Sequence, residues 1–292
     1  MPSLGGPEES TRRYDAPEAP EHGPPPRSVV AELQDLWVHR ALLSHFVIND
    51  LKFRYIGSSI GFFWTVVNPL LELITYTFVF HIVLDVKFHA SGGTVHYSLF
   101  LFCGMVAWFG FADGVKRATD AVVGHAHLIK KVNFPAAILP AHVVLSAAIN
   151  QVVRFGILAL GVVFFGRGLG PTFLLLPAFI LLQALFTMGL AFLLCTANVF
   201  FRDTSHWVGA LLMPWMFLSP IFYPPSAYPK SFGLLLQLNP MAHIVGIYQE
   251  IVLNQHLPDV RQVMFAVLFS VSMLVIGFSV FVHHRRKFAD LT

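Results

Sequence analysis

Charge is scarce in this sequence. Only 12% of its 292 residues are Asp, Glu, Lys or Arg, whereas 55% are hydrophobic. Soluble domains carry about 25% charged and about 45–50% apolar residues, so this composition excludes an ordinary soluble enzyme or binding module. It indicates an integral membrane protein with one membrane domain. The formal net charge of +3 gives no reason to expect a nucleic-acid partner.

Several chemical signatures are missing as well. The two cysteines, Cys103 and Cys195, lie in apolar runs without metal-ligand spacing, and the histidine pairs have no further ligands nearby. The sequence contains no G-x-x-x-x-G-K-[ST] phosphate-binding loop and no G-x-S-x-G nucleophile motif. We therefore expect no metal site, no cofactor, no catalytic residue and no ATP hydrolysis by the chain itself.

The N-terminal part of the chain changes character at about residue 28. Residues 1–27 are rich in proline, glycine and acidic residues and lack an apolar core, which predicts a disordered cytoplasmic tail rather than a signal peptide. In 28–56, apolar residues recur at helical spacing on one face, while charged residues such as Glu32 fall mostly elsewhere and Arg40 interrupts the stripe. We expect an amphipathic helix on the membrane surface with its charged side toward the cytoplasm. A short soluble helix packed on another surface is the alternative.

Six apolar runs reach or approach the roughly 20 residues that a helix needs to cross the hydrocarbon core. They lie near 60–84, 96–114, 136–165, 171–199, 205–223 and 261–283. Charged residues follow the second run, so its helix is expected to continue into the cytoplasm. Most lysines and arginines fall on the cytoplasmic side if both termini are inside, as the positive-inside rule requires. We therefore predict an all-α protein with six transmembrane helices and cytoplasmic termini.

The segment 224–260 lies between the last two predicted spans. Its two apolar pieces, 231–238 and 241–253, are each too short to cross the membrane. Asn239 and Pro240 separate them, and this pair is typical of a turn or a helix start. We expect a short re-entrant pair of helices that dips into the outer leaflet and packs against the spans, because unpaired backbone needs protein or water there. A plain surface helix is the alternative.

Two charged residues lie in the middle of predicted spans, Glu72 and Arg154. A charge at membrane depth is costly and usually functional. These two either pair with one another or line a polar path, and the sequence leaves both possibilities open. Asn68 and Pro69 precede Glu72, and Pro69 removes a backbone hydrogen bond, so we expect a kink in the first span. A kinked and partly polar helix suits the wall of a pore.

Small residues precede the first span. Gly57 and Gly61 are expected to let the surface helix turn upward into the span, because small residues permit a sharp redirection of the backbone. Lys52, Arg54 and Tyr55 are expected to fix this elbow at the headgroup level, with the two cations near lipid phosphates.

Aromatic side chains in the predicted spans are candidates for a sugar path, because the apolar face of a pyranose stacks on an aromatic ring. Rings that contact lipid at the membrane interfaces are the alternative. The predicted channel residues are Asn68, Glu72, Arg154 and the rings of Phe62, Trp64, Tyr76, Trp108, Phe111, Trp215 and Tyr223.

Four motifs occur in order along the chain: "KFRYIGSSIGFFWTVVNPLLELITYTFVF" at 52–80, "LIKKVNFPAAILP" at 128–140, "NVFFRDTSHWV" at 198–208, and "SPIFYPPSAYP" through "LNPMAHIVGIYQEIVL" at 219–253. In this order they resemble the membrane subunit of ABC-2 type polysaccharide exporters, the permeases for O-antigen, teichoic acid and related lipid-linked glycans. The resemblance covers roughly 30–292, so 57–292 is identified as an ABC-2 type transmembrane domain. Related sequences often have a charged pair after the Phe-Pro of the second motif, where this chain has Ala136 and Ala137. No role can therefore be assigned to a charge there.

The resemblance implies a multi-pass half-transporter of the bacterial inner membrane, which forms a homodimer and binds two copies of a separate ATPase subunit. That partner would bind ATP and Mg, and the substrate would be a lipid-linked glycan. The residues implied to couple to the ATPase are Leu128, Ile129, Lys130, Lys131, Val132, Asn133, Phe134, Pro135, Arg202 and Asp203. Two alternatives stay open: an ABC-2 exporter of small amphipathic drugs or peptides, and a membrane glycosyl- or acyltransferase that acts without ATP.

Overall fold

The computed structural model describes residues 29–54, 61–83, 93–131, 134–164, 168–225, 228 and 230–291. Within these ranges every regular element is helical and no strand occurs, which confirms the all-α prediction. The α-helices are α1 (Val29–Val38), α2 (Arg40–Phe53), α3 (Trp64–Thr77), α4 (Gly93–Thr119), α5 (Ala121–Gly124), α6 (Ala126–Lys131), α7 (Ile138–Phe164), α8 (Leu176–Phe200), α9 (Thr204–Leu218), α10 (Gly233–Leu238), α11 (Pro240–Gln249), α12 (Val260–His284) and α13 (Phe288–Leu291). Shorter turns are the 3₁₀-helices η1 (Gly61–Phe63), η3 (Pro171–Leu175), η5 (Lys230–Phe232) and η7 (Arg285–Lys287), and the π-helices η2 (Phe78–Val83) and η6 (Glu250–Asn254). The predicted tail, 1–27, lies outside the described residues.

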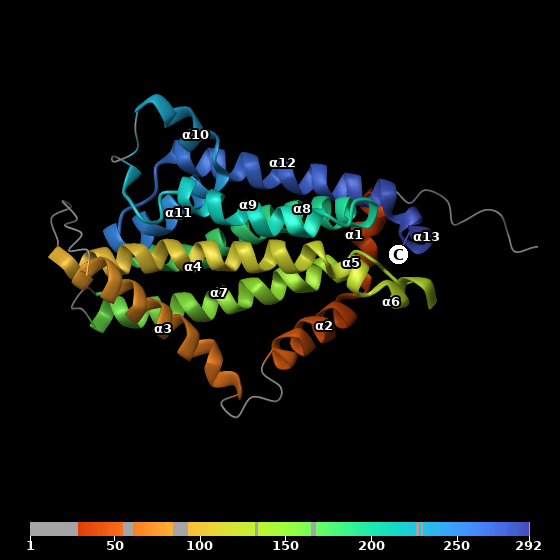
Figure 1. Ribbon diagram of the computed structural model, residues 1–292, viewed down its shortest axis with the longest axis horizontal. Coiled ribbons are helices and arrows are strands. Elements are labelled where there is room, and N and C mark those ends of the chain that lie inside the picture. The colour runs from red at the N-terminus through yellow and green to blue at the C-terminus, as the bar shows by residue number, and fades with distance from the viewer. Residues whose placement is uncertain are drawn as a thin grey trace, which may run out of the picture.

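The long helices α4, α7, α8 and α12 lie side by side along the length of the molecule (Figure 1). In the described part of the chain, four helices are long and apolar enough to cross a membrane: Tyr97–Thr119, Ile138–Phe164, Pro171–Phe200 and Val260–Lys287. They confirm helices at four of the predicted spans, and α4 continues beyond residue 114 as expected. The first and fifth predicted spans contain shorter helices, the apolar helix Trp64–Phe80 and the 15-residue α9.

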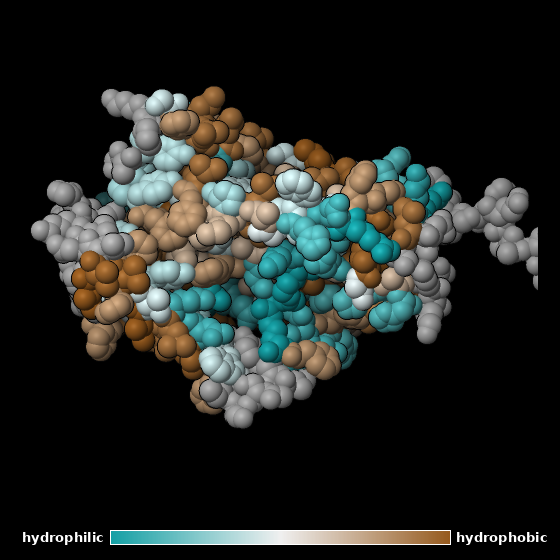
Figure 2. Space-filling model, viewed as in Figure 1, coloured by the Kyte–Doolittle hydropathy of each residue, from teal (hydrophilic) through white to brown (hydrophobic). Residues whose placement is uncertain are grey.

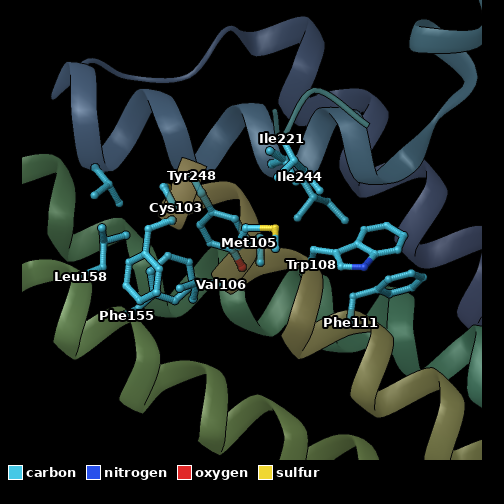
Figure 3. Close-up of a cluster of buried hydrophobic side chains, with 14 of the residues drawn as sticks. Cys103, Met105, Val106, Trp108, Phe111, Phe155, Leu158, Ile221, Ile244 and Tyr248 are labelled. Atoms are coloured by element: carbon cyan, nitrogen blue, oxygen red, sulfur yellow. The ribbon is translucent and has the colours of Figure 1, made fainter. Parts of the chain in front are cut away.

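Helix α4 is the centre of the bundle. In the most apolar stretch of α4, 83% of the residues are buried inside the protein, whereas in that of α12 only 28% are buried. It packs against α3, α7, α8, α9 and α11. Figure 3 shows the middle of this core, where Tyr248 of α11 lies beside Cys103 and Met105 of α4 and Phe155 of α7. The centres of the Phe155 and Tyr248 rings are 4.7 Å apart. Side chains from α4, α7 and α11 therefore pack together in the middle of the core.

The predicted pair of short helices is present as α10 and α11, and η6 extends α11. They meet at Asn239 and Pro240, as the sequence indicates. The side chain of Asn239 accepts a hydrogen bond from the backbone N–H of Met241 at 3.0 Å, and Pro240 occupies the first helical turn. Such a cap satisfies one of the free N–H groups at a helix start. Helix α11 is buried against α4 and α12, which confirms that it packs on the spans.

The N-terminal region differs from its prediction in two respects. The expected single helix over 28–56 breaks at His39 into α1 and α2. Glu32 does not face the cytoplasm, because it is only 1% exposed and forms an ion pair with Arg285 of η7. Leu36 and Leu43 pack against the buried cluster at the C-terminal end of α12. Helices α1 and α2 are therefore held against the C-terminal end of α12 and η7.

Helices α8 and α12 make the most extensive contact in the described bundle. At its centre, a Cβ built on Gly277 would overlap the backbone oxygen of Gly189. Glycine permits such close helix approach, so we expect Gly277→Ala to force the helices apart at a cost of about 1–3 kcal/mol. Gly209→Ala in α9 is the matched control, since nothing lies within 4 Å of its added Cβ. Melting curves of the purified variants test this, and equal melting temperatures would contradict it.

Candidate functional site

A polar cavity of about 310 Å³ lies between α3, α4 and α7. Three of the predicted channel residues line it, Trp64 and Asn68 from α3 and Arg154 from α7. The other lining residues are Arg54, Thr65, Pro69, Phe109, Gly110, Ala112, Asp113, Lys116, Ala147, Asn150, Gln151 and Leu212. Figure 2 shows hydrophilic side chains gathered over the middle of one face of the molecule, between hydrophobic areas.

Glu72 and Arg154 form an ion pair between α3 and α7. Arg154 Nη1 lies 3.1 Å from Glu72 Oε2, and the Arg154 guanidinium lies 5.0 Å from the centre of the Phe109 ring. Of the two possibilities left open by the sequence, pairing is therefore realised. Arg154 also lines the cavity, so this one side chain joins two helices and presents a cation at the cavity wall.

Two aspartates and two arginines join α2 to α4 beside the cavity. Arg54, the C-cap residue of α2, pairs with Asp113 of α4, and Arg117 of α4 pairs with Asp50 of α2, each with a nitrogen–oxygen distance of 2.6 Å. Asp50 also accepts a hydrogen bond from the hydroxyl of Ser146 in α7. We call these four charged residues the Asp–Arg clamp. It connects the N-terminal helix pair to the centre of the bundle.

The clamp gives Arg54 a partner that was not predicted, because its guanidinium donates to the Asp113 carboxylate of α4. The available signal is the repeat of D-x-x-x-R at 50–54 and at 113–117. Residues four apart share one face of a helix, so each segment presents two opposite charges to a neighbour. Of the other predicted elbow residues, Lys52 is exposed, whereas Tyr55 and Gly57 lie outside the described residues.

The cavity also contains hydrogen-bonding groups without a protein partner. Thr65 Oγ1 and Asn150 Nδ2 are buried and bond to no described residue. Buried polar groups are rarely left unpaired in proteins, so these two groups are available to a polar ligand. Of the four charged lining residues, three are cations: Arg54, Lys116 and Arg154. The wall can therefore bind hydroxyl groups and anionic oxygens. Among the described residues, no three His, Cys, Asp or Glu side chains gather as a metal site would need.

Two predicted channel rings, Trp108 and Phe111, lie in the core instead. They are 3% and 0% exposed, and Figure 3 shows them on α4 among the packed core side chains. Trp215 of α9 packs against Phe111 with 5.1 Å between the ring centres, and its indole N–H donates to Asn239 Oδ1 at 2.9 Å. These contacts hold α9 and the α10–α11 pair to α4, which corrects the assignment of Trp108 and Phe111 to a channel wall.

Tyr76 and Tyr223, two further predicted rings, do not line the cavity. Tyr76 is half-buried, with its ring 6.5 Å from that of Phe80. The Tyr223 hydroxyl donates to the backbone oxygen of Phe217 at 2.5 Å. The side chain of Phe62 lies outside what the structure describes. The structure thus brings Trp64, Asn68 and Arg154 together at the cavity, with Glu72 beside them.

Comparison with known proteins decides the family. The model of the ABC-2 type transporter family matches residues 45–253, from within α2 to within η6. The chain belongs to the ABC-2 type transporter family. This match includes all the residues that line the cavity and all four residues of the Asp–Arg clamp.

Several relatives of this ABC-2 transporter are permeases. The O-antigen export system permease protein RfbA of Myxococcus xanthus is 34% identical over 263 residues, which cover 88% of this chain and 98% of that protein. An O-antigen export system permease protein RfbA of Klebsiella pneumoniae is 27% identical over 83% of this chain and 92% of that protein. The polysialic acid transport protein KpsM of Escherichia coli is 21% identical over 87% of this chain and 97% of that protein.

Helix α6, which carries the predicted coupling residues Leu128 and Ile129 of the ABC-2 transporter, lies at the same end of the bundle as α5 and α13 (Figure 1). Leu128, Ile129 and Pro135 are half-buried. The half-buried Phe134 ring lies 5.8 Å from the ring of Phe46 in α2. This segment therefore packs against the helix that carries one half of the Asp–Arg clamp. The side chains of Lys130 and Lys131, and residues Val132 and Asn133, lie outside what the structure describes.

Arg202 and Asp203 are exposed in the turn between α8 and α9. Asp120, at the start of α5, holds this turn in place. It accepts a hydrogen bond from Asn198 Nδ2 at 3.1 Å and another from the Ser205 hydroxyl at 2.8 Å. Through this carboxylate the start of α5 is connected to both sides of the turn that carries Arg202 and Asp203.

Proposed function

We propose that this chain is the transmembrane permease subunit of an ATP-driven exporter, which moves a lipid-linked polysaccharide across the bacterial inner membrane. The observation that carries the proposal is the similarity to an O-antigen export permease over 88% of the chain. Relatives named for polysialic acid transport and capsule polysaccharide export point to the same class of substrate. A polar cavity in a bundle of apolar helices supports the proposal, because a glycan needs hydrogen-bonding groups along its path.

In this proposal, two copies of the chain form the channel and each binds one ATPase subunit on the cytoplasmic side. The partner binds ATP and Mg, while this chain holds no cofactor and performs no catalysis. Each copy crosses the membrane six times, using the helix Trp64–Phe80 and α9 beside the four long helices. Helices α1 and α2 lie along the inner surface, both termini are cytoplasmic, and α10 and α11 enter the outer leaflet.

The cavity provides groups suited to a sliding glycan. The Trp64 ring offers an apolar face to a pyranose, and the amides of Asn68 and Asn150 offer hydrogen bonds to its hydroxyl groups. Lys116 and Arg154 add positive charge for acidic sugars or for a lipid-linked phosphate. Because the contacts are few and spread over three helices, no single sugar is held tightly.

The proposed coupling path begins where the ATPase contacts α6 and the turn at 201–203. Movement of α6 reaches α2 through the contact of Phe134 with Phe46, whose ring centres are 5.8 Å apart. The Asp–Arg clamp then carries movement of α2 to α4, and Arg54 and Asp113 of the clamp line the cavity. A displacement at the ATPase can therefore change the cavity without unfolding a span.

The primary test asks which of the two subunits binds and hydrolyses ATP. The purified chain should bind no ATP, because it lacks a phosphate-binding loop, whereas the complex with its ATPase should hydrolyse ATP. Deleting the chain should remove the exported polysaccharide from the cell surface and leave it inside the cell. ATP hydrolysis by the isolated chain, or normal surface polysaccharide after the deletion, would overturn the proposal.

Phe134 is the coupling residue whose role is easiest to separate from folding. We expect Phe134→Ala to reduce retention of the ATPase about fivefold or more, because truncating an interface anchor typically costs more than about 1 kcal/mol. Phe46→Ala is the matched control, since it removes the other ring of the same contact within this chain. The measurement is ATPase co-purification together with the melting temperature of the permease. Unchanged co-purification with Phe134→Ala would mean that the residue only packs on α2.

A further inference from the structure

An apolar groove of about 610 Å³ lies between α2, α7 and α8, away from the polar cavity. Its lining residues include Arg40, Ser44 and Ile48 of α2, Ala148 and Val152 of α7, and Leu181 of α8. Several of these apolar side chains are open to the surroundings, including Ile48 at 47%, Val152 at 52% and Leu181 at 65% exposure. A groove of this composition favours a hydrocarbon occupant.

Helix α7 separates the groove from the polar cavity. Its residues Ala147, Gln151 and Arg154 line the cavity, whereas Ala148 and Val152 line the groove. With 3.6 residues per turn, these two sets lie on different faces of the helix. A ligand in the groove therefore occupies a second site, which is distinct from the site of the proposed function.

The groove has a polar end formed by Arg40 and Ser44 in the first turns of α2. The Arg40 guanidinium donates to the backbone oxygen of Trp37 at 3.3 Å and lies 5.5 Å from the centre of the Trp37 ring. Arg40 is the charged residue among those that line the groove, and no acidic residue lines it. An arginine is well suited to bind phosphate oxygens.

A positive charge beside a hydrocarbon groove matches the order of groups in a membrane lipid. We propose that the groove binds one anionic glycerophospholipid, with its phosphate on Arg40 and one acyl chain along Ala148, Val152 and Leu181. A second copy of the chain fits less well, because a symmetric contact would bring both Arg40 side chains to one apolar surface without a carboxylate. The bound lipid fixes α2 against α7 and α8, and so stabilises the helix that carries Asp50 and Arg54 of the clamp.

The test is native mass spectrometry of the full chain in detergent, titrated with phosphatidylglycerol or phosphatidylcholine of identical acyl chains. The wild-type protein should retain one phosphatidylglycerol in preference to phosphatidylcholine. Arg40→Gln should weaken phosphatidylglycerol binding about tenfold, which corresponds to about 1.4 kcal/mol, and should remove the preference. Ala148→Phe should fill the groove and weaken binding of both lipids.

Two variants serve as controls. Ala178→Phe places the same ring on an exposed position of α8 outside the groove lining, and Lys287→Gln removes an exposed cation from the C-terminal region. Both should bind phosphatidylglycerol as the wild type does. The proposal is overturned if the wild type retains no lipid, if Arg40→Gln keeps the preference, or if the controls lose binding equally. Occupation of the groove by a second copy of the chain, seen as a dimer mass that Ala148→Phe abolishes, would also overturn it. None of these outcomes depends on which substrate is exported.

Discussion

Replacing Gly61 with leucine is expected to abolish glycan export while leaving the transporter assembled in the membrane. Gly61 has a φ of +54°, a left-handed conformation that costs a residue with a Cβ roughly 1–2 kcal/mol. Nothing lies within 4 Å of a Cβ added there, so the penalty comes from the backbone and not from a clash. Gly61 begins η1, which leads directly into α3. Relief of the strain would redirect α3 and thereby displace one wall of the polar cavity.

Two variants isolate the backbone conformation as the cause. Gly61→Asn should retain most of the export, because asparagine adopts left-handed φ values far more readily than leucine. Gly156→Leu in α7 is the matched control, since Gly156 also has nothing within 4 Å of an added Cβ but has no positive φ. ATP hydrolysis by the purified complex and glycan at the cell surface are measured for each variant. Full export by Gly61→Leu, or equal loss by Gly156→Leu, would contradict the expectation.

The α10–α11 pair shows which parts of the fold can be predicted from sequence. Its signals are local, because Asn239 caps the helix that Pro240 begins, and both pieces are too short to cross a membrane. The break between α1 and α2 at His39 is harder to predict from the sequence, because it depends on how Leu36 and Leu43 pack against the end of α12. A helical pattern in 28–56 therefore predicts helix correctly without predicting the change of direction.

Burial within the bundle could not be predicted from hydropathy. Helix α12 is more apolar than α4, yet a much larger share of α4 is buried in the protein. Lipid tails are as apolar as a protein core, so an apolar residue can lie in either. For this reason Trp108 and Phe111 look in sequence like rings that line a path, although both are buried in the core.

The site shows the same contrast between local and tertiary information. Charges at mid-span identify Glu72 and Arg154 as important because their burial is costly wherever they lie. The Asp–Arg clamp escapes prediction because each D-x-x-x-R segment also suits an ordinary pair within one helix. Only the packing of α2 on α7 brings Asp50 and Arg54 close enough to pair with Arg117 and Asp113 of α4.

Loss of the ion pair between Glu72 and Arg154, beside the cavity, is expected to have the second large effect on glycan export. Arg154→Gln should reduce glycan export at least about tenfold, because it leaves Glu72 without its partner at 3.1 Å and removes a cation from the cavity wall. Removing one member of a buried pair costs about 3–5 kcal/mol, and solvent screening reduces this value here because the two side chains are 22% and 27% exposed. The loss in the single variant combines both causes, so a second variant is needed to separate them.

Glu72→Gln together with Arg154→Gln separates the structural role of the pair from the role of the cation. Two neutral amides can hydrogen-bond to one another, so the double variant should recover the melting temperature and assembly that Arg154→Gln loses. We expect export to stay low in the double variant, since the cavity still lacks the charge of Arg154. Glu72→Gln alone keeps that charge and should export more than the double variant does. If the double variant exports as well as the wild type, Arg154 only fastens α7 to α3, because recovery of the helix contact would then be sufficient to restore transport.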